Sequence, residues 1–315
     1  MIQIITRRLL MLIPILLGVS ILTFGAMHAI PGDLAVILLG VERAQDPVAL
    51  ENIRAKYGLD EPVPVQYAKW LGNAVRLDFG DSLRLNVPVR DEIMRRLPIT
   101  IQLAMMSVVY GLVVGGVIGT MAAIRGGWWG AFGRLYNIFG IAVPSFFLAT
   151  LLILFGTRYV GFIPTLEYVR FTEDPVRNMM LMIYPTLSLG TGLSAVIGEN
   201  VRSAVTETMS LDHVRVARSK GLAERSVVIR HILKNAMIPI TTVTGLQAAF
   251  LLGGTIIVET IFAIPGLGRL ALSAINLRDY PLMMGIVLII AVMVVLASLI
   301  ADLLYALFDP RIRVS

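Results

Sequence analysis

Six long apolar runs recur along the chain, and they limit what it can fold into more than any other feature. A helix needs about 20 apolar residues to cross the hydrocarbon core of a bilayer. Backbone polar groups in lipid must be paired within the chain, and the alternating pattern of a transmembrane barrel is absent. The sequence therefore predicts an all-α membrane protein with six transmembrane helices, over residues 9–30, 99–124, 135–155, 180–197, 239–261 and 282–307.

The composition supports a chain embedded in lipid. Hydrophobic residues make up 57% of the sequence and charged residues 15%, whereas soluble domains carry about a quarter charged residues. The mean hydropathy is +0.80. The absence of cysteine excludes a disulfide scaffold, a thiolate metal site and a cysteine nucleophile. The first apolar run is too long for the core of a signal peptide, so we expect an uncleaved anchor.

The connection between the first two runs, residues 31–98, is long and polar, and it contains helix signals. Asp46 suits the N-cap of a helix, Pro47 the first helical position and Gly58 the end. The segment is therefore expected to fold as a small helical cap. Further helical stretches are expected over residues 65–76 and 89–96.

The placement of charge predicts the orientation in the membrane. With the N-terminus in the cytoplasm, basic residues outnumber acidic ones in the inner segments, whereas the outer segments are balanced. Cytoplasmic loops usually carry the excess of Lys and Arg, so both termini are expected inside and the cap outside. The expected divisions are residues 1–98 for the first span and the cap, 99–308 for the other spans, and 309–315 for a cytoplasmic tail.

Small residues recur every four positions in several of the runs, which lets helix backbones approach closely in a membrane. Two interpretations of these rows stay open, namely simple cohesion of the helix bundle and sliding surfaces for a conformational cycle. The rows are Gly111, Gly115 and Gly119; Gly190, Ser194 and Gly198; and Gly245, Ala249 and Gly253.

The loop between the fourth and fifth runs, residues 202–238, is unlike the others because it is strongly basic. Ser210 suits a helix N-cap and Gly221 the position just after a helix end, so a short helix is expected between them. Such a helix suits docking into a groove on a partner protein or lying on anionic lipid headgroups, and both stay open. The loop lacks stacking aromatics, which argues against nucleic-acid binding. One face of the expected helix carries Val214, Ala217 and Arg218.

This loop resembles the EAA loop of ABC-type importer permeases, whose pattern is Glu-Ala-Ala, three residues, Gly, nine residues and Ile-x-Leu-Pro. When the loop is aligned on Gly221, Ala217 matches the second Ala. The loop sequence Val-Arg-x-Ala-Arg-x-Lys-Gly-Leu is similar to the same segment in the dipeptide/oligopeptide/nickel branch of that family. The general pattern is not met at Arg215, Val216, His231 and Lys234.

Further motifs of that branch follow in order along nearly the whole chain. The chain therefore resembles the B-type membrane subunit of binding-protein-dependent importers. The motifs are Ile-Pro-Gly-Asp at 30–33, Tyr-Gly-Leu-Asp at 57–60, Asp-Phe-Gly-Asp-Ser at 78–82, Glu-Thr-Ile-Phe at 259–262, Pro-Gly-Leu-Gly-Arg at 265–269, Arg-Asp-Tyr-Pro at 278–281, Asp-Leu-Leu-Tyr at 302–305 and Asp-Pro-Arg-Ile-Arg at 309–313.

The resemblance implies an ABC type I importer permease fold and a set of partners. These partners are a second homologous permease subunit, two ABC ATPase subunits and an extracytoplasmic solute-binding protein, in the cytoplasmic (inner) membrane of a bacterium or archaeon. No phosphate-binding loop of the form Gly-x-x-x-x-Gly-Lys-Ser/Thr occurs in the sequence. ATP and Mg are therefore expected on the ATPase partners, with no catalytic residue and no cofactor on this subunit.

The resemblance also assigns roles to residues of the basic loop. Its short helix would couple the ATPases to the membrane spans. His231 and Asn235 would support this helix. The coupling residues would be Leu211, Asp212, His213, Val214, Arg215, Val216, Ala217, Arg218, Ser219, Lys220 and Gly221.

Acidic residues within or beside the spans are functional candidates by default, because charge in lipid is unfavourable. These residues lie near the ends of their spans, which favours pairing at helix ends over contact with a substrate. Arg269 is a candidate partner for Glu259, and Arg7 or Arg8 for Asp302. The histidines are not spaced as a metal site. The acidic candidates are Glu199, Glu259 and Asp302.

The function expected from the resemblance is the uptake of small peptides. Nickel chelates, glutathione and opine-like solutes are alternatives within the same class of transporter. An ion-coupled secondary transporter would prefer ionisable groups near the midplane of the membrane, where this sequence has almost none. A membrane enzyme would need paired carboxylates, a metal motif or a nucleophile, and the sequence shows no such constellation.

Overall fold

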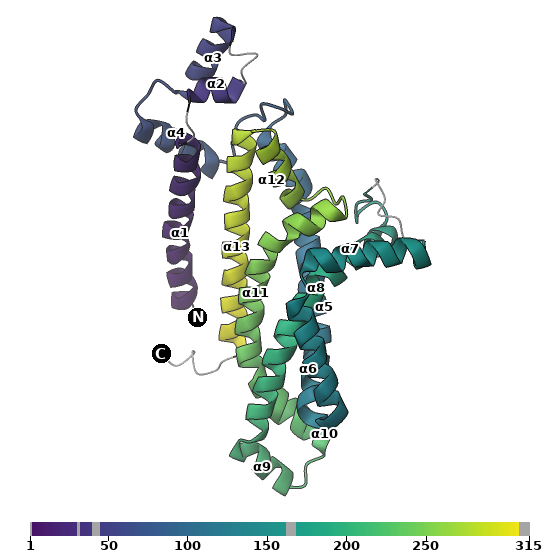
Figure 1. Cartoon of the computed structure of the whole chain (residues 1–315). Coiled ribbons are helices and arrows are strands. Elements are labelled where there is room, and N and C mark those ends of the chain that lie inside the picture. The colour runs from purple at the N-terminus through teal and green to yellow at the C-terminus, as the bar shows by residue number, and fades with distance from the viewer. Residues whose placement is uncertain (1, 30–31, 40–44, 162–167, 309–315) are drawn as a thin grey trace. The chain divides into compact units, whose positions relative to one another are not determined.

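Helices make up nearly all of the described part of the chain. The computed structural model describes residues 2–29, 32–39, 45–161 and 168–308. Within these ranges the only β feature is an isolated bridge between Asp81 and Pro88. The expected all-α fold class is therefore confirmed for the described residues (Figure 1).

The chain divides into two compact units. The bundle unit comprises residues 1–5, 100–264 and 294–315. The cap unit comprises residues 6–99 and 265–293. The helices that belong to both units are α1 (Ile2–His28), α5 (Val89–Arg125) and α13 (Tyr280–Phe308).

Among the described residues, four helices are long and apolar enough to cross a membrane, namely α1, α5, α8 (Pro175–Met209) and α13. They contain the first, second, fourth and sixth predicted spans. The fifth predicted span lies within α11 (Lys234–Ile261), several of whose side chains fall outside the described residues. The six-span count therefore stays a prediction.

The predicted third span, residues 135–155, is bent in the structure. α6 (Gly127–Ala142) meets the run formed by α7 (Ser145–Phe155) and the π-helical turn η2 (Gly156–Val160) at an angle of 102°. The bend lies at Pro144. Proline has no amide hydrogen, and it disfavours helical geometry in the residue before it. The expected span is therefore sharply broken at this proline, and the two pieces count as at most one span.

The cap unit confirms the helix signals in the connection after α1. α3 (Pro47–Tyr57) begins as predicted, since Asp46 Oδ1 accepts the amide hydrogen of Val48 at an N–O distance of 3.0 Å. Gly58 ends α3 in the left-handed conformation, with φ of 61°. α4 (Val63–Val75) covers the second expected stretch. Two short helices have no counterpart in the prediction, α2 (Leu34–Leu39) and α12 (Leu267–Asn276).

The third expected stretch, residues 89–96, is not a separate helix. α5 runs unbroken from Val89 to Arg125 and includes Pro98. No glycine separates this stretch from the apolar run that follows, and proline is tolerated inside membrane helices. The stretch is therefore the first part of the long helix that contains the second span.

The core of the cap unit joins segments that are far apart in the sequence. Buried side chains from the end of α4, the following loop and the start of α5 pack against α12 and the first part of α13. Gly285 of α13 lies so close to this core that an added Cβ would be 2.9 Å from Val89 Cγ1. The core residues are Ala74, Phe79, Val89, Ile93, Leu267, Leu270, Ala274, Leu282, Ile286, Leu288 and Ile289.

A buried carboxylate ties the loop before α5 to the loop before α13. Asp279 is fully buried and accepts hydrogen bonds from Ser82 Oγ at 2.5 Å and from the amide nitrogen of Arg84 at 3.3 Å. Arg84 Nε also donates to the Leu277 carbonyl at 3.0 Å. A buried charge needs such donors, so the cluster fixes the two loops against each other. The Asp-Phe-Gly-Asp-Ser and Arg-Asp-Tyr-Pro motifs of the sequence therefore meet at one place.

α8 is the helix around which the bundle unit is built. α6, α7 and α11 all pack against it, and the short elements after α8 contact its end. Ser188 Oγ of α8 donates to the Ser145 carbonyl at the start of α7, with a distance of 2.7 Å. α8 therefore links most helices of the bundle unit to the basic loop that follows it.

The glycine rows place helix backbones in direct contact. A Cβ added at Gly115 would lie 2.3 Å from the Ser194 carbonyl oxygen, and one at Gly119 would lie 2.4 Å from that of Gly198. The first two predicted rows therefore pack against each other across α5 and α8. Gly245 of the third row is equally crowded, by Ala301 of α13. These contacts support cohesion of the bundle as the role of those rows.

Candidate functional site

The basic loop between α8 and α11 is organised by one short helix. α9 (Asp212–Ser219) follows α8 after only two residues. Asp212 in its first turn complements the positive end of the helix dipole. Lys220 ends α9, and Gly221 follows with φ of 73° and donates its amide hydrogen to the Arg218 carbonyl at 2.9 Å. Gly221 therefore takes the left-handed position predicted for it.

The start of α9 differs from the prediction. Ser210 caps the end of α8, where its Oγ donates to the Glu207 carbonyl at 2.7 Å, and Leu211 takes the N-cap position of α9. The last carbonyls of a long helix lack partners, and a serine directly after it can satisfy one of them. α9 is therefore eight residues long, shorter than the expected stretch from Leu211 to Lys220.

α9 packs through two small side chains. Val214 and Ala217 are buried, and α9 contacts the π-helical segment η3 (Val227–Leu233) and the end of α8. Arg218 was expected on the same face but is exposed, where it pairs with Glu224. The other expected coupling residues are all exposed: Leu211, Asp212, His213, Arg215, Val216, Ser219, Lys220 and Gly221.

Two exposed ion pairs order the loop around α9. Arg218 donates from Nη2 to Glu224 Oε1 at 2.6 Å and from Nε to Oε2 at 3.2 Å. Arg215 Nη1 lies 3.3 Å from Asp212 Oδ1. The Arg218 guanidinium holds the pKa of the Glu224 carboxyl below its usual range. Water screens exposed pairs, so their effect is to hold α10 (Glu224–Ser226) beside the end of α9 rather than to add much stability.

His213 on α9 and Asn235 on α11 meet at the backbone carbonyl of His231. Asn235 Nδ2 donates to this carbonyl at 2.7 Å and lies 3.2 Å from His213 Nε2. His213 Nε2 is 3.4 Å from the same carbonyl. The structure thus brings His213 together with the two residues expected to support the coupling helix. Their role in coupling stays a prediction.

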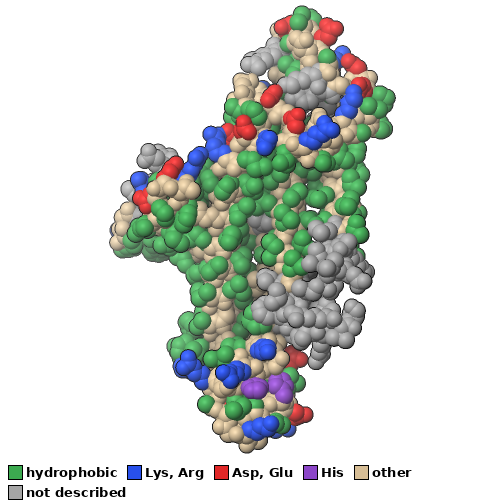
Figure 2. Space-filling view, turned by 180° about the vertical axis from the view of Figure 1, so that it is seen from behind, with side chains coloured by type: hydrophobic (Ala, Val, Ile, Leu, Met, Phe, Trp, Pro, Cys, Tyr) green, Lys and Arg blue, Asp and Glu red, His purple; other side chains and the backbone are tan. Residues whose placement is uncertain are grey.

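The surface of this loop is basic, and the helices beside it are apolar. Figure 2 shows Lys, Arg and His side chains gathered at the loop end of the bundle unit, next to helices covered by hydrophobic side chains. This contrast is typical of the place where membrane helices enter water. The exposed basic residues of the loop are Arg215, Arg218, Lys220, Arg225, Arg230 and Lys234. Exposed apolar residues of α6 include Leu135, Ile138 and Phe139.

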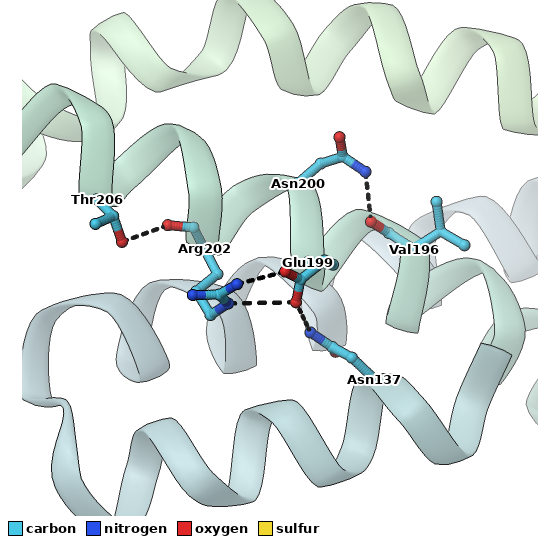
Figure 3. Close-up of polar contacts among 6 residues, drawn as sticks. All are labelled: Asn137, Val196, Glu199, Asn200, Arg202 and Thr206. Atoms are coloured by element: carbon cyan, nitrogen blue, oxygen red, sulfur yellow. Dashed lines mark hydrogen bonds and ion pairs between the residues drawn. The ribbon is translucent and has the colours of Figure 1, made fainter. Parts of the chain in front are cut away.

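Glu199 joins α8 to α6. Its Oε2 accepts hydrogen bonds from Asn137 Nδ2 of α6 at 3.0 Å and from Arg202 Nε at 3.2 Å, and Arg202 Nη2 contacts its Oε1. Asn200 points away from this cluster, and its Nδ2 donates to the Val196 carbonyl at 2.8 Å (Figure 3). The candidate acid is therefore paired both along its own helix and with a neighbouring helix.

Glu259 is fully buried near the end of α11. Its Oε1 accepts a hydrogen bond from Thr100 Oγ1 of α5 at 2.7 Å. Its candidate partner Arg269 belongs to the cap unit, and that pairing stays a prediction. Among the described residues, no three His, Asp or Glu side chains gather as a metal site. The side chains of Asp302, Arg7 and Arg8 lie outside the described residues.

The neutral partners in these clusters were not found from the sequence. Thr100 and Asn137 lie inside apolar runs, where a single polar residue is common. Asn137 does carry a signal, since it falls on a stripe of α6 whose other buried members are all glycine. That register marks it as a helix contact. The stripe is Gly130, Gly133, Asn137 and Gly140.

Solved structures of ABC importers share the fold of this chain. The MetNI methionine ABC transporter, in an inward-facing conformation, matches with a TM-score of 0.54 and 16% identity, over 69% of this chain and 96% of the other. An amino acid ABC transporter solved with histidines matches with a TM-score of 0.52 and 20% identity, over 68% of this chain and 93% of the other. The fold is therefore that of the membrane subunits of such importers.

The sequence places the chain within one family of these subunits. It belongs to the family described as binding-protein-dependent transport system inner membrane component, which matches residues 115–314, and the N-terminal region of such components matches residues 1–104. A peptide transport system permease protein of Brucella abortus (strain 2308) is 37% identical over 314 residues, 99% of each chain. The glutathione transport system permease protein of Escherichia coli (strain K12) is 38% identical over 314 residues, again 99% of each chain. The chain is a permease subunit of an ABC importer and is not itself an ATPase.

Proposed function

We propose that this permease subunit passes small peptides across the cytoplasmic membrane. A solute-binding protein delivers them from outside, and two separate ATPase subunits, which bind ATP and Mg, drive the cycle. A second homologous permease subunit completes the pathway. The observation that carries the proposal is the geometry of α9, a short helix with two buried side chains and a basic outer surface, joined to α8 by two residues. The name of the Brucella relative supports peptides as the substrate.

Rigidity is the physical argument for coupling through α9. Val214 and Ala217 pack the helix against η3 and α8, and the pair of Arg218 with Glu224 holds its end. A partner that moves α9 therefore also moves the end of α8. Because α8 contacts α6, α7 and α11, the displacement reaches the helices that surround it.

The proposal places both termini and the basic loop in the cytoplasm, and α2, α3 and α4 outside. The basic surface of the loop supports this orientation. The chain has no cysteine, so single cysteines can report it without background. A cysteine at Ser219 is expected to react with a membrane-impermeant thiol reagent only from the cytoplasmic side, and one at Glu51 only from the outside. The reverse pattern would contradict the orientation.

Two substitutions test the coupling role of α9. Gly221→Pro cannot adopt the observed φ of 73°, and Ala217→Trp does not fit the buried site. We expect both variants to insert into the membrane, but to take up labelled dipeptide about tenfold less per ATP hydrolysed. The complex is reconstituted in vesicles with its partner subunits. Val109→Ala, on an exposed part of α5, is the control. Normal coupled uptake by both variants would refute the proposal.

Glutathione is the second candidate substrate, because the E. coli relative is named for its transport. Nickel chelates and opine-like solutes complete the set to be tested. Each unlabelled solute competes with labelled dipeptide for uptake by the complex and its own solute-binding protein. The solute that competes at the lowest concentration is the substrate. Uptake driven by a proton gradient without ATP would instead indicate an ion-coupled transporter.

A further inference from the structure

Within the cap unit, the last turns of α1 are joined to α4 by polar and aromatic contacts on one face (Figure 1). Ser20, Phe24 and His28 follow one another at intervals of four residues, so they share a face of α1. The hydroxyls of Ser20 and Tyr67 are 2.7 Å apart, and His28 Nε2 lies 3.2 Å from Gln66 Oε1. The ring centroids of Phe24 and Tyr67 are 5.5 Å apart. These five residues form what we call the α1–α4 joint.

The orientation of the Gln66 amide in this joint is fixed by its NH2 group. Nε2 donates to the carbonyl oxygens of Leu59 and Glu61, at 3.1 and 2.8 Å. If the amide were turned over, its oxygen would face two other acceptors. The group that faces His28 is therefore the amide oxygen, which can only accept a hydrogen bond. Gln66 is buried, so this oxygen needs a donor from within the protein.

Both ring nitrogens of His28 consequently face acceptors. Nδ1 lies 3.1 Å from the Phe24 carbonyl oxygen, and Nε2 faces the Gln66 amide oxygen. A neutral imidazole has one N–H group and one bare nitrogen, so it can bond only one of these acceptors. The protonated ring has two N–H groups and bonds both. The geometry therefore suits the charged form of His28.

The Phe24 ring supports the same form. Its centroid lies 4.3 Å from that of the His28 ring, at an interplanar angle of 31°. A cation this close to an aromatic face is attracted by it. In the described part of the chain, the His28 ring makes no ion pair that could take over this role.

The charged groups around the joint are few, and Glu61 is already paired, with Lys69 Nζ at 2.5 Å from its Oε1. Met27, beside His28, packs near α3, α4 and the start of α13. The described titratable and charged side chains of α3, of α4, of the turn between them and of the cap part of α13 are Glu51, Arg54, Asp60, Glu61, Tyr67, Lys69 and Tyr280.

We propose that His28 makes the α1–α4 joint sensitive to pH. In acid the ring carries two protons and bonds both acceptors; as the pH rises and the ring becomes neutral, one of the two bonds is lost. The contribution of His28 to the joint is therefore full in acid and decreases with rising pH. The bond between Ser20 and Tyr67 does not change, because histidine is the ordinary side chain that changes its charge between about pH 5 and 8.

The inference goes beyond the proposed function, since it concerns how the cap unit is held and not what the importer carries. Only the side of the membrane depends on that function. In the proposed orientation the joint lies at the outer end of α1, where the pH of the medium outside the cell would set it.

Amide hydrogen exchange in α4, measured by mass spectrometry on the full chain in detergent, tests the proposal. His28→Gln keeps a polar side chain but cannot be charged. We expect this variant to exchange about tenfold faster than the natural chain at about pH 5.5, and at most about threefold faster at about pH 8. The ratio of the two chains at one pH cancels the intrinsic dependence of exchange on pH.

Ser20→Ala is the matched control, because it removes the other polar contact of the same joint. It is expected to speed exchange in α4 by the same factor at both pH values. The proposal fails if His28→Gln has no effect in acid, if its ratio does not decrease with pH, or if the Ser20→Ala ratio decreases equally. The experiment involves no substrate, partner or membrane side, so failure of the proposed function would leave its result intact.

Nuclear magnetic resonance of the ring protons gives a measurement that does not depend on stability. The chain has three histidines, so isotope-labelled histidine gives few signals, and those of His28 are the ones lost in His28→Gln. In acid we expect two N–H protons of His28 that exchange slowly with water, because both are hydrogen-bonded. His213→Gln should leave both in place. A single slowly exchanging proton on His28 would overturn the proposal, since the ring would then bond only one acceptor.

Discussion

Two carboxylates hold distant segments of this protein together, the buried Asp279 and the partly exposed Glu199, and both accept hydrogen bonds from neutral groups. Asp279 joins two loops of the cap unit through Ser82 and a backbone amide, and Glu199 joins α6 to α8 through Asn137. An acid in a site of low dielectric needs donors, since an unpaired charge there is strongly unfavourable. The donors therefore matter as much as the acids.

Removal of the Asp279 carboxylate tests this dependence. Asp279→Ala leaves Ser82 Oγ and the Arg84 amide without their acceptor, so we expect a loss of about 2 kcal/mol or more in the free energy of unfolding. Thermal unfolding in detergent, followed by circular dichroism, measures it. Asp78→Ala is the matched control, because Asp78 is exposed and, among the described residues, accepts a side-chain hydrogen bond only from the Gly80 amide. Equal losses from both variants would show that burial is not the cause.

The pair of Glu224 with Arg218 predicts a pH dependence of order in the loop after α9. Arg218 lowers the pKa of Glu224, so the pair is present at neutral pH and is lost as the pH falls through the lowered value. We expect Glu224→Gln to speed amide hydrogen exchange in α10 at neutral pH. In acid below the pKa of Glu224, the variant and the natural chain should exchange alike. Glu207→Gln, another exposed acid, is the control; a difference that persists in acid would contradict the role of the pair.

At the scale of the element, capping residues determine where a helix ends, and small residues determine where two helices pack closely. Asp46, Gly58 and Gly221 have the conformations that their sequence context predicts. Ser210 does not, because its hydroxyl donates to a carbonyl at the end of α8 and does not cap the start of α9. A bend at Pro144 is expected of a proline within an apolar run, but its angle of 102° cannot be predicted, since an apolar run shows only that a segment avoids water and does not show its direction.

The contact between α5 and α8 gives a prediction with a control one residue away. Gly115→Ala would place a Cβ 2.3 Å from the Ser194 carbonyl oxygen, whereas the same change at Gly116 meets nothing within 4 Å. We expect Gly115→Ala to destabilise the protein by about 1–3 kcal/mol. Gly116→Ala should be neutral or slightly stabilising, because alanine favours the helix. Thermal unfolding in detergent compares the two. A Gly115→Ala variant as stable as Gly116→Ala would show that the helices separate easily.

At the scale of the whole molecule, composition and apolar runs are sufficient to predict a helical membrane protein, and the motifs are sufficient to indicate its family. The meeting of Ser82 with Asp279, 197 residues apart, could not be predicted, because pairing at such separation depends on the packing of several helices. The partners Asn137 of Glu199 and Thr100 of Glu259 could not be predicted for the same reason. The short helix α9 could be predicted from the sequence, because a helix stop and a basic surface are local features.

The buried glycines of α6, of which Gly133 faces α5 and Gly140 faces α8, have a consequence for how this family member can change over generations. Glycine is the smallest residue, so every mutation at Gly133 or Gly140 adds volume and pushes α6 outward from its neighbours. The spacing of these helices can therefore be widened by substitution but never narrowed. A closer contact must arise by substitution on the facing helices, where residues such as Thr191 and Ala195 can be replaced by smaller ones.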